Sequence, residues 1–430
     1  MKNTLTICIL LLVFGSIFFG CKKDEETIAV GPITVNGFVK DYNGQPISGA
    51  AVIIAGKTPT TTSASGTFSI PNVTTPYDIS VVLSASKAAI VYKGLYRQDP
   101  KLLYLESVGA GTYYTATING FTPIISDRTT RVIFVSGNRA SARTTDPTTG
   151  TYSRTVTWTG TADSLVGKLY LIRYVTNPAG ITDIYDAYAI KNLTIKNGIT
   201  YNNQNFSNSD LINPPDLSIS GTMPYPADYT LSFRYLYMMF GEALVYLAPE
   251  STPLLGDFSI SVPSIPDIKF AIWGGASKGT YPNSQYTSFR KVGIAAGATS
   301  VNIKLETAPH LALPLNNSTN IDTLTDFTWT QGGGEGINLF IIYPAVYSTP
   351  PVNPTYYIFT AGNTIRLPNL SSQGLGLPAN TGYQWYVYKY FPVPSVDDIA
   401  SDTFRKLWYG EALMDFGYGG SETFNFTTKP

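Results

Sequence analysis

The chain has 430 residues, which is too many for one ordinary core and indicates three or four domains of roughly 100–150 residues each. Hydrophobic residues make up 43% of the chain, and charged residues make up only 13%, about half the usual share. In place of charged residues the chain uses Thr, Ser, Asn, Gly and Tyr, a composition typical of all-β exported proteins. The formal net charge is zero. Because nucleic-acid binding needs a basic surface, the composition predicts no nucleic-acid partner.

A short leader opens the chain. Lys2 gives it a positive start, residues 5–19 are nearly all apolar, and Gly20 and Cys21 follow. The apolar run is shorter than the ~20 residues that a membrane-spanning helix needs. The pattern therefore predicts a secretory signal over residues 1–20, and the alternative is an uncleaved N-terminal anchor.

The end of the leader resembles a lipobox, in which a small residue precedes the cysteine that is lipidated. The residues that carry this resemblance are Phe18-Phe19-Gly20-Cys21, and the two phenylalanines depart from the preferred Leu and Ala or Ser. Residues 22–26, Lys-Lys-Asp-Glu-Glu, resemble the export signal of Bacteroidota surface lipoproteins, although a solvated linker has the same composition. The resemblance implies lipidation of Cys21, a linker over 21–32 and a place on the outer membrane, exposed at the cell surface.

Residues 33–107 are predicted to form the first β-sandwich. Asn43-Gly44 predicts a hairpin turn, because both residues tolerate positive φ. Strands are expected at 50–55, 66–70 and 77–81 from apolar runs and alternation. The residues Gly37, Val39, Asp41, Gly44, Pro46, Ile47, Gly66, Phe68, Ile70, Tyr77, Ile79 and Val81 follow the pattern of a known family. The segment resembles the carboxypeptidase regulatory-like domain, which implies a small transthyretin-like sandwich.

The name of that family does not imply peptidase activity here. A zinc carboxypeptidase needs at least two histidine ligands and a carboxylate, and the whole chain has one histidine, His310. The metal site cannot be built, so we expect an accessory module with no cofactor and no metal.

Two further sandwiches are predicted over 108–213 and 214–312. In the first, strands are expected at 115–120, 131–135, 152–158 and 168–175; in the second, at 217–221, 229–237, 258–263 and 269–273. Both segments end in a strand, a glycine turn and a closing strand, at 191–206 and 290–305. This similarity favours a tandem repeat. The alternative is that any two β-sandwiches end in hairpins.

Residues 313–430 are predicted to form the last sandwich. Strands are expected at 325–329, 337–343, 364–368 and 383–387, with a final strand at 421–428. Trp329 lies on an early strand, and Tyr383 occupies the place of a tyrosine corner. The segment resembles a fibronectin type III or related immunoglobulin-like domain. The insert at 391–420 exceeds what that fold requires, and its start suggests a short helix through Arg405.

Few residues suggest catalysis. His310 stands alone, and a linker histidine is the simpler interpretation. The glycines at 332–336 lack the lysine of a phosphate loop and predict a hairpin turn. Asp183/Asp186 and Asp397/Asp398 are neighbours in sequence, which is no evidence of a pair across a cleft. We therefore expect a protein that is not an enzyme, with a carboxylate-based hydrolase as the least favoured alternative.

The aromatic residues are the stronger candidates for a binding site. The segment 383–390 places aromatic side chains on both faces of one strand, so one set must lie outside the local core. Rings that stay exposed can stack on sugars or dock proteins, whereas packing between domains is the simpler explanation. The candidate ligand-binding aromatics are Tyr386, Tyr388, Tyr390, Trp408 and Tyr409.

The sequence thus predicts an all-β lipoprotein of tandem β-sandwich domains: a transthyretin-like unit, two middle sandwiches and an immunoglobulin or fibronectin III-like unit. Its partners would be the membrane, through the lipid on Cys21, and a glycan or envelope protein. We expect a binding or adhesion module. The alternative is a structural accessory subunit of an envelope complex.

Overall fold

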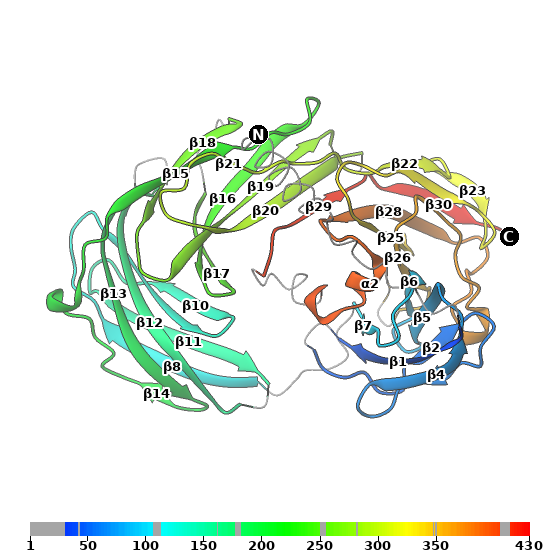
Figure 1. Ribbon diagram of the computed structural model, residues 1–430, viewed down its shortest axis with the longest axis horizontal. Helices are drawn as coiled ribbons and strands as arrows, with labels where there is room; N and C mark the ends of the chain where they lie inside the picture. Colours follow the sequence, from blue (N-terminus) through cyan, green and yellow to red (C-terminus); the bar gives the residue numbers. More distant parts are fainter. Residues whose placement is uncertain are drawn as a thin grey trace, which may run out of the picture.

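The computed structural model describes residues 31–41, 44–105, 113–160, 162–176, 182–249, 255–280, 283–346, 348, 351–404 and 413–430. Over these residues the protein is built from β-sheets arranged as four sandwich-like units (Figure 1). The helices with defined bounds are α2 (Val396–Ile399) and the 3₁₀ turns η1 (Asn208–Asp210) and η2 (Ser371–Gln373). The predicted all-β class of tandem sandwiches is confirmed.

The first unit has seven strands in two sheets. The strands are β1 (Ile33–Lys40), β2 (Ala51–Ile54), β3 (Thr60–Thr61), β4 (Thr67–Val73), β5 (Tyr77–Leu83), β6 (Ala88–Leu95) and β7 (Lys101–Leu103). One sheet has the order β4-β1-β7, with β1 and β7 parallel, and the other contains β3-β2-β5-β6. Gly66 has a φ of +79° and opens β4 where a side chain would strike the Val39 carbonyl, so the turn requires glycine.

The second unit repeats this strand order. Its strands are β8 (Tyr113–Phe121), β9 (Thr129–Ser136), β10 (Arg139–Thr144), β11 (Thr151–Thr159), β12 (Ser164–Thr176), β13 (Thr182–Lys196) and β14 (Thr200–Tyr201). One sheet is β10-β9-β12-β13 and the other is β11-β8-β14, again with a parallel pair of the first and seventh strands.

The third unit has the same order once more. Its strands are β15 (Asp216–Thr222), β16 (Thr230–Phe240), β17 (Ala243–Pro249), β18 (Asp257–Pro263), β19 (Ile268–Lys278), β20 (Gln285–Ile294) and β21 (Val301–Asn302). They form β17-β16-β19-β20 against β18-β15-β21. The sequence suggested a shared plan for the second and third units only, whereas the same strand order also describes the first.

The fourth unit has a different order. Its strands are β22 (His310–Leu313), β23 (Ser318–Ile321), β24 (Phe327–Thr330), β25 (Ile337–Pro344), β26 (Thr355–Thr360), β27 (Thr364–Ile365), β28 (Gly382–Phe391), β29 (Phe416–Gly420) and β30 (Phe424–Thr428). The sheet β22-β24-β27 packs against strands ordered β26-β25-β28, which β29 and β30 continue. Because β22 pairs with β24, this unit begins at His310, and the predicted boundary between 312 and 313 falls inside its first strand.

One sheet of 14 strands runs through the first, third and fourth units. Strand β6 of the first unit pairs in parallel with β26 of the fourth, and β20 of the third pairs with β29 of the fourth. The first and fourth units therefore lie side by side although they are far apart in sequence (Figure 1). The sequence predicted tandem sandwiches as separate modules, and these pairings join three of them in one sheet.

Apolar residues on both faces explain why β6 and β25 lie inside this sheet. Residues 88–92 of β6, Ala-Ala-Ile-Val-Tyr, are all at most 3% exposed. Alternate residues of β6 enter two different cores: Ile90 and Tyr92 face the core of the first unit, and Val91 faces that of the fourth. Continuous apolar runs of this kind are typical of strands covered on both sides.

The insert after β28 ties the fourth unit to the first. Ser395 caps α2 by accepting a hydrogen bond from the Asp398 N–H. The Asp397 carboxylate accepts hydrogen bonds from the backbone N–H groups of Tyr96 (3.1 Å) and Arg97 (3.0 Å). Ile399 joins the core of the first unit. The predicted helix reached Arg405, which lies outside the described residues.

We expect Asp397→Ala to lower the free energy of unfolding by roughly 1–3 kcal/mol, because it leaves two backbone donors without their acceptor. Chemical denaturation of the full chain measures this. Asp402→Ala is the matched control, since Asp402 also links the insert to the first unit, through an exposed pair with Lys40 at 3.3 Å. That change should cost about 0.5 kcal/mol or less. Equal losses for the two variants would contradict a structural role for Asp397.

Candidate aromatic binding site

The predicted aromatic residues have different positions. Tyr386, Tyr388 and Tyr390 lie on one face of β28, as the alternation predicted. Tyr390 is only 4% exposed and is therefore a core residue that offers no surface to a ligand. Tyr386 and Tyr388 are half-buried. The other candidates, Trp408 and Tyr409, and the predicted lipidation site Cys21 lie outside the described residues.

The described part of the insert covers Tyr390. The Tyr390 ring contacts the Phe404 ring edge-on, with centroids 5.7 Å apart, and stacks on the Phe416 ring at 5.9 Å. Tyr388 lies beside Tyr418 of β29, at 6.2 Å, and beside Tyr386, at 5.1 Å. The face of β28 that the sequence left open is thus partly filled by packing between elements of one chain.

The same face continues across the joined sheet into the third unit. Tyr390 lies opposite Tyr418 of β29, which lies opposite Ser288 of β20. Ser288 lies opposite Gly275 of β19, and Gly275 lies opposite Phe233 of β16. We call the rings on this face the aromatic belt; they are Phe233, Tyr235, Tyr237, Tyr246, Trp273, Tyr286, Tyr386, Tyr388, Tyr390, Phe416 and Tyr418.

The belt is most accessible where it reaches β16, β17 and β19, here called its open end. Phe233 stacks on Tyr235 with centroids 4.8 Å apart and meets Trp273 edge-on at 5.7 Å. Tyr246 contacts both Tyr235 (5.6 Å) and Tyr237 (5.7 Å) and is 41% exposed. The other four rings are half-buried. The opposite face of these strands packs on β15 and β18, which lie outside the curved sheet, so the belt lies on its inner side (Figure 1).

Two glycines make room for the rings. A side chain at Gly275 would overlap the Phe233 ring, and one at Gly420 would overlap the Tyr286 ring. Each ring can therefore lie flat over the neighbouring strand, which shields backbone that would otherwise be exposed. The two glycines thus let these rings lie close to the sheet.

Burial keeps three tyrosines of the belt uncharged over a wide pH range, because it raises the pKa of each hydroxyl. Burial raises the pKa of Tyr286 and of Tyr386 far above the ordinary value, and the neighbouring Tyr388 raises both further. Burial, with smaller effects of Tyr246 and Tyr235, raises the pKa of Tyr237 to about 12. At neutral pH every one of these hydroxyls is protonated and can donate as well as accept hydrogen bonds.

A second polar cluster surrounds His310 at the junction of the third and fourth units. The Glu422 carboxylate is buried and accepts hydrogen bonds from Gln285 Nε2 (2.8 Å) and the Leu311 N–H (3.0 Å). His310 Nδ1 lies 2.6 Å from the same carboxylate, but the histidine side chain is 63% exposed. The neighbouring Ser421 hydroxyl donates to the Glu422 carbonyl rather than reaching the imidazole. The cluster joins two units and does not resemble a nucleophilic triad.

The aspartates considered for hydrolysis hold other contacts. Asp186 pairs with Arg128 at 2.9 Å and Arg173 at 3.0 Å, while Asp397 and Asp398 serve the insert described above. The side chain of Asp183 is outside the described residues.

Among the residues that the structure describes, no group of three or more His, Cys, Asp or Glu could hold a metal ion. No helix in the same residues is long and apolar enough to cross a membrane.

Comparisons with known proteins identify the first unit only. The family model of the carboxypeptidase regulatory-like domain matches residues 34–94. No match was found among the curated proteins. This segment is thus a carboxypeptidase regulatory-like domain, as its glycine and apolar pattern predicted.

Two solved structures have a distant likeness to the chain. The Bacillus anthracis TIE protein is 9% identical, with 64% of this chain and 50% of that protein covered, at a TM-score of 0.16. The chain thus spans about half the length of that protein. A tetra-tandem repeat in the extending region of a large adhesion protein is 10% identical and has a TM-score of 0.14. That match covers 83% of this chain and 95% of the repeat structure. At these TM-scores neither likeness supports an inference about this chain.

Tyr237 gives a test of the belt's burial. Because its folded pKa of about 12 exceeds its unfolded value near 10, its contribution to stability is complete below pH 10 and is lost as the pH rises through 12. We expect the unfolding free energy of the wild type to fall more steeply between pH 10 and 12 than that of Tyr237→Phe. Denaturant titrations across this range measure the difference, and parallel curves would show that Tyr237 is solvated.

Proposed function

We propose that the chain is a lipid-anchored protein of the outer membrane that binds a glycan on its aromatic belt at the cell surface. The observation that carries the proposal is the open end of the belt, where five rings form one half-buried, partly exposed surface. Apolar ring faces bordered by neutral hydroxyls suit sugars, which present C–H faces and hydroxyl groups together. The leader, Cys21 and the charged run after it support the anchor.

The geometry of the open end supports binding rather than catalysis. Phe233, Tyr235 and Trp273 belong to central strands of a large sheet, so their backbone positions are fixed by neighbours on both sides. Rings held in this way lose little conformational freedom when a ligand binds. Acid groups engaged elsewhere, such as Asp186 and Asp397, are consistent with a protein that is not an enzyme.

A structural role in an envelope complex is the second candidate. The joined sheet favours it, because the first and fourth units are held in one fixed arrangement by the β6–β26 pairing. The strand order of the fourth unit also supports the fibronectin III-like assignment, and such modules serve as spacers as well as binding domains. Crosslinking in intact cells that recovers one stable protein partner would favour this candidate.

Glycan capture is tested with the soluble mature chain and immobilised polysaccharides. We expect Trp273→Ala and Tyr235→Ala each to weaken retention roughly tenfold, because each removes a stacking ring. Tyr96→Ala is the control, since Tyr96 is 47% exposed and lies outside the belt. Near-ultraviolet circular dichroism verifies folding. Retention that survives both belt substitutions, or no retention by any polysaccharide, would refute the proposed ligand site.

The anchor and its orientation are tested in cells. We expect Cys21→Ser to move the chain from the membrane fraction to the soluble fraction, because the lipid is its only predicted attachment. For the wild type, a protease added to intact cells should remove the fourth unit. Protection of that unit would place it in the periplasm and favour the envelope-complex candidate.

A further inference from the structure

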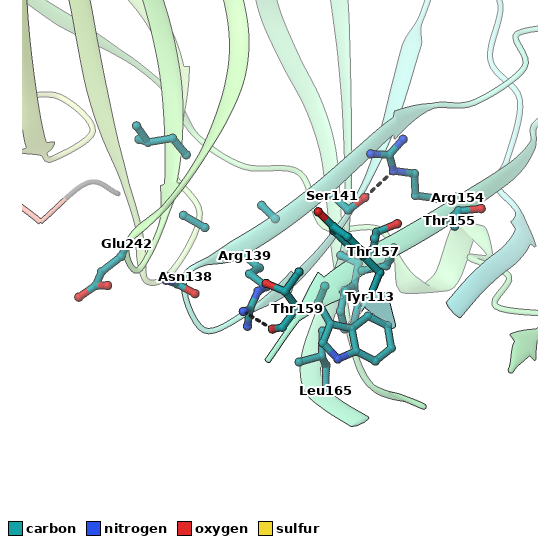
Figure 2. Close-up of a pocket in the computed structure, with 16 residues that line it drawn as sticks. Tyr113, Asn138, Arg139, Ser141, Arg154, Thr155, Thr157, Thr159, Leu165 and Glu242 are labelled. Atoms are coloured by element: carbon teal, nitrogen blue, oxygen red, sulfur yellow. Dashed lines mark hydrogen bonds between the residues drawn. The ribbon is translucent and has the colours of Figure 1, made fainter. Parts of the chain in front are cut away.

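Three sheet edges meet at a groove that adjoins the open end of the aromatic belt at Tyr246. Strands β10, β11 and β17 each end a sheet, so each has a hydrogen-bonded neighbour on one side only among the described strands. Two adjoining pockets of about 490 and 540 Å³ lie along β10 and share Ala140 and Leu244. The first lies between β10 and β11 (Figure 2), and the second lies between β10 and β17. We call this region the edge groove.

The backbone of β10 presents hydrogen-bonding groups to the groove. The Thr145 N–H donates to the Thr130 carbonyl, which fixes the alternation along this antiparallel pair. The odd-numbered residues of β10 therefore bond to β9, and the N–H and C=O groups of Ala140, Ala142 and Thr144 point away from it. A row of outward groups on an edge strand is a template for another strand.

The walls of the groove, β11 and β17, have outward carbonyls that accept hydrogen bonds from arginine side chains. The Tyr246 carbonyl of β17 accepts a hydrogen bond from Arg131 Nη1. The Thr159 carbonyl of β11 accepts one from Arg139 Nη2 at 2.9 Å (Figure 2). Arginine donors thus satisfy edge carbonyls that no strand covers.

The groove is rich in arginine without matching acid. Arg131, Arg139, Arg143 and Arg154 line it and form no ion pair within the described residues, whereas Glu242 is the acid among its lining residues. Four arginines elsewhere in the described residues are paired with aspartates: Arg97 with Asp99, Arg128 and Arg173 with Asp186, and Arg366 with Asp326. In a chain with zero net charge, this cluster indicates an acidic ligand.

The two faces of β10 differ in chemistry. Arg139, Ser141 and Arg143 alternate with Ala140 and Ala142 along the strand. The arginine face lies toward β11, where Arg154 Nε donates to the Ser141 hydroxyl (Figure 2). The alanine face packs at the edge of the apolar core shared by the second and third units. A strand added to β10 would meet charge on one face and small apolar groups on the other.

We propose that the edge groove binds an extended acidic segment of a partner protein, which adds to β10 as a strand. Its acidic side chains pair with Arg139, Arg143 and Arg154, and its alternate small apolar side chains lie against Ala140 and Ala142. The ligand is a peptide because it must supply backbone N–H and C=O groups at strand spacing. An anionic glycan would satisfy the arginines but would leave the edge of β10 unpaired.

The probe is a fluorescent peptide of alternating glutamate and valine with the length of β10, six residues. Anisotropy with the full mature chain should show binding that weakens with added salt, and a lysine-valine peptide should not bind. We expect the double change Arg139→Ser and Arg143→Ser to weaken binding roughly tenfold or more, the effect of two lost charge-assisted hydrogen bonds. Arg366→Ser is the control and should leave binding unchanged, because Arg366 is an exposed arginine of the fourth unit.

A second variant separates strand addition from simple charge attraction. Ala142→Pro removes one outward N–H while leaving the hydrogen bonds to β9 in place. It should therefore weaken binding of the peptide but not binding of polygalacturonate, an anionic polysaccharide. Failure of the peptide to bind, or binding that both the arginine pair and Ala142→Pro leave unchanged, would overturn the proposal. Tighter binding of polygalacturonate than of the peptide would make the groove a glycan site and overturn it also. If Ala142→Pro does not fold, the arginine variants and the competition decide.

Discussion

The parallel pairing of β6 with β26 is the constraint on which the arrangement of the chain depends. Without it, β6 and β26 would each be an edge strand with apolar side chains on both faces, which is a surface prone to aggregation. The pairing satisfies both backbones and places Val91 in the core of the fourth unit and Tyr92 in that of the first. Two sandwiches then share one sheet, and their relative position is fixed by hydrogen bonds rather than by a linker.

The joined sheet also explains the aromatic belt. Side chains on one face of a sheet stay on that face from strand to strand, so rings of β28 in the fourth unit continue as rings of β20 and β16 in the third. In the first unit the same face is covered by β1 and β4 and forms a closed core. Toward β16 and β17 none of the described strands covers it, and most of the rings there are half-buried.

The sequence could predict what depends on local patterns. Alternation located β28 and the face that carries Tyr386 and Tyr388, and the glycine pattern identified the first unit. Pairings between units could not be predicted from the sequence. The apolar run at 88–92 indicates that both faces of β6 are buried, but it does not indicate which strand pairs with its edge. For the same reason the sequence could not predict that Tyr390 is buried. It also could not predict that the face of β28 that carries Tyr390 continues across the sheet to Trp273 on β19. Tyr235 and Tyr237 lie two residues apart in the expected strand 229–237, but only the register places Tyr235 opposite Trp273.

The repeated strand order explains why the edge groove lies where it does. Each seven-strand unit leaves two edges in its larger sheet, at the third and sixth strands. The sixth strands of the first and third units, β6 and β20, pair with the fourth unit. The third strand of the first unit, β3, has only two residues and offers little edge. The third strands of the other two units, β10 and β17, are longer and lie beside each other, and neither has a second neighbour among the described strands. Arginines rather than the usual lysines line the groove between them. An edge that is long, open and charged with one sign is protected against pairing with copies of itself, because two such edges repel, but it remains available to an acidic strand.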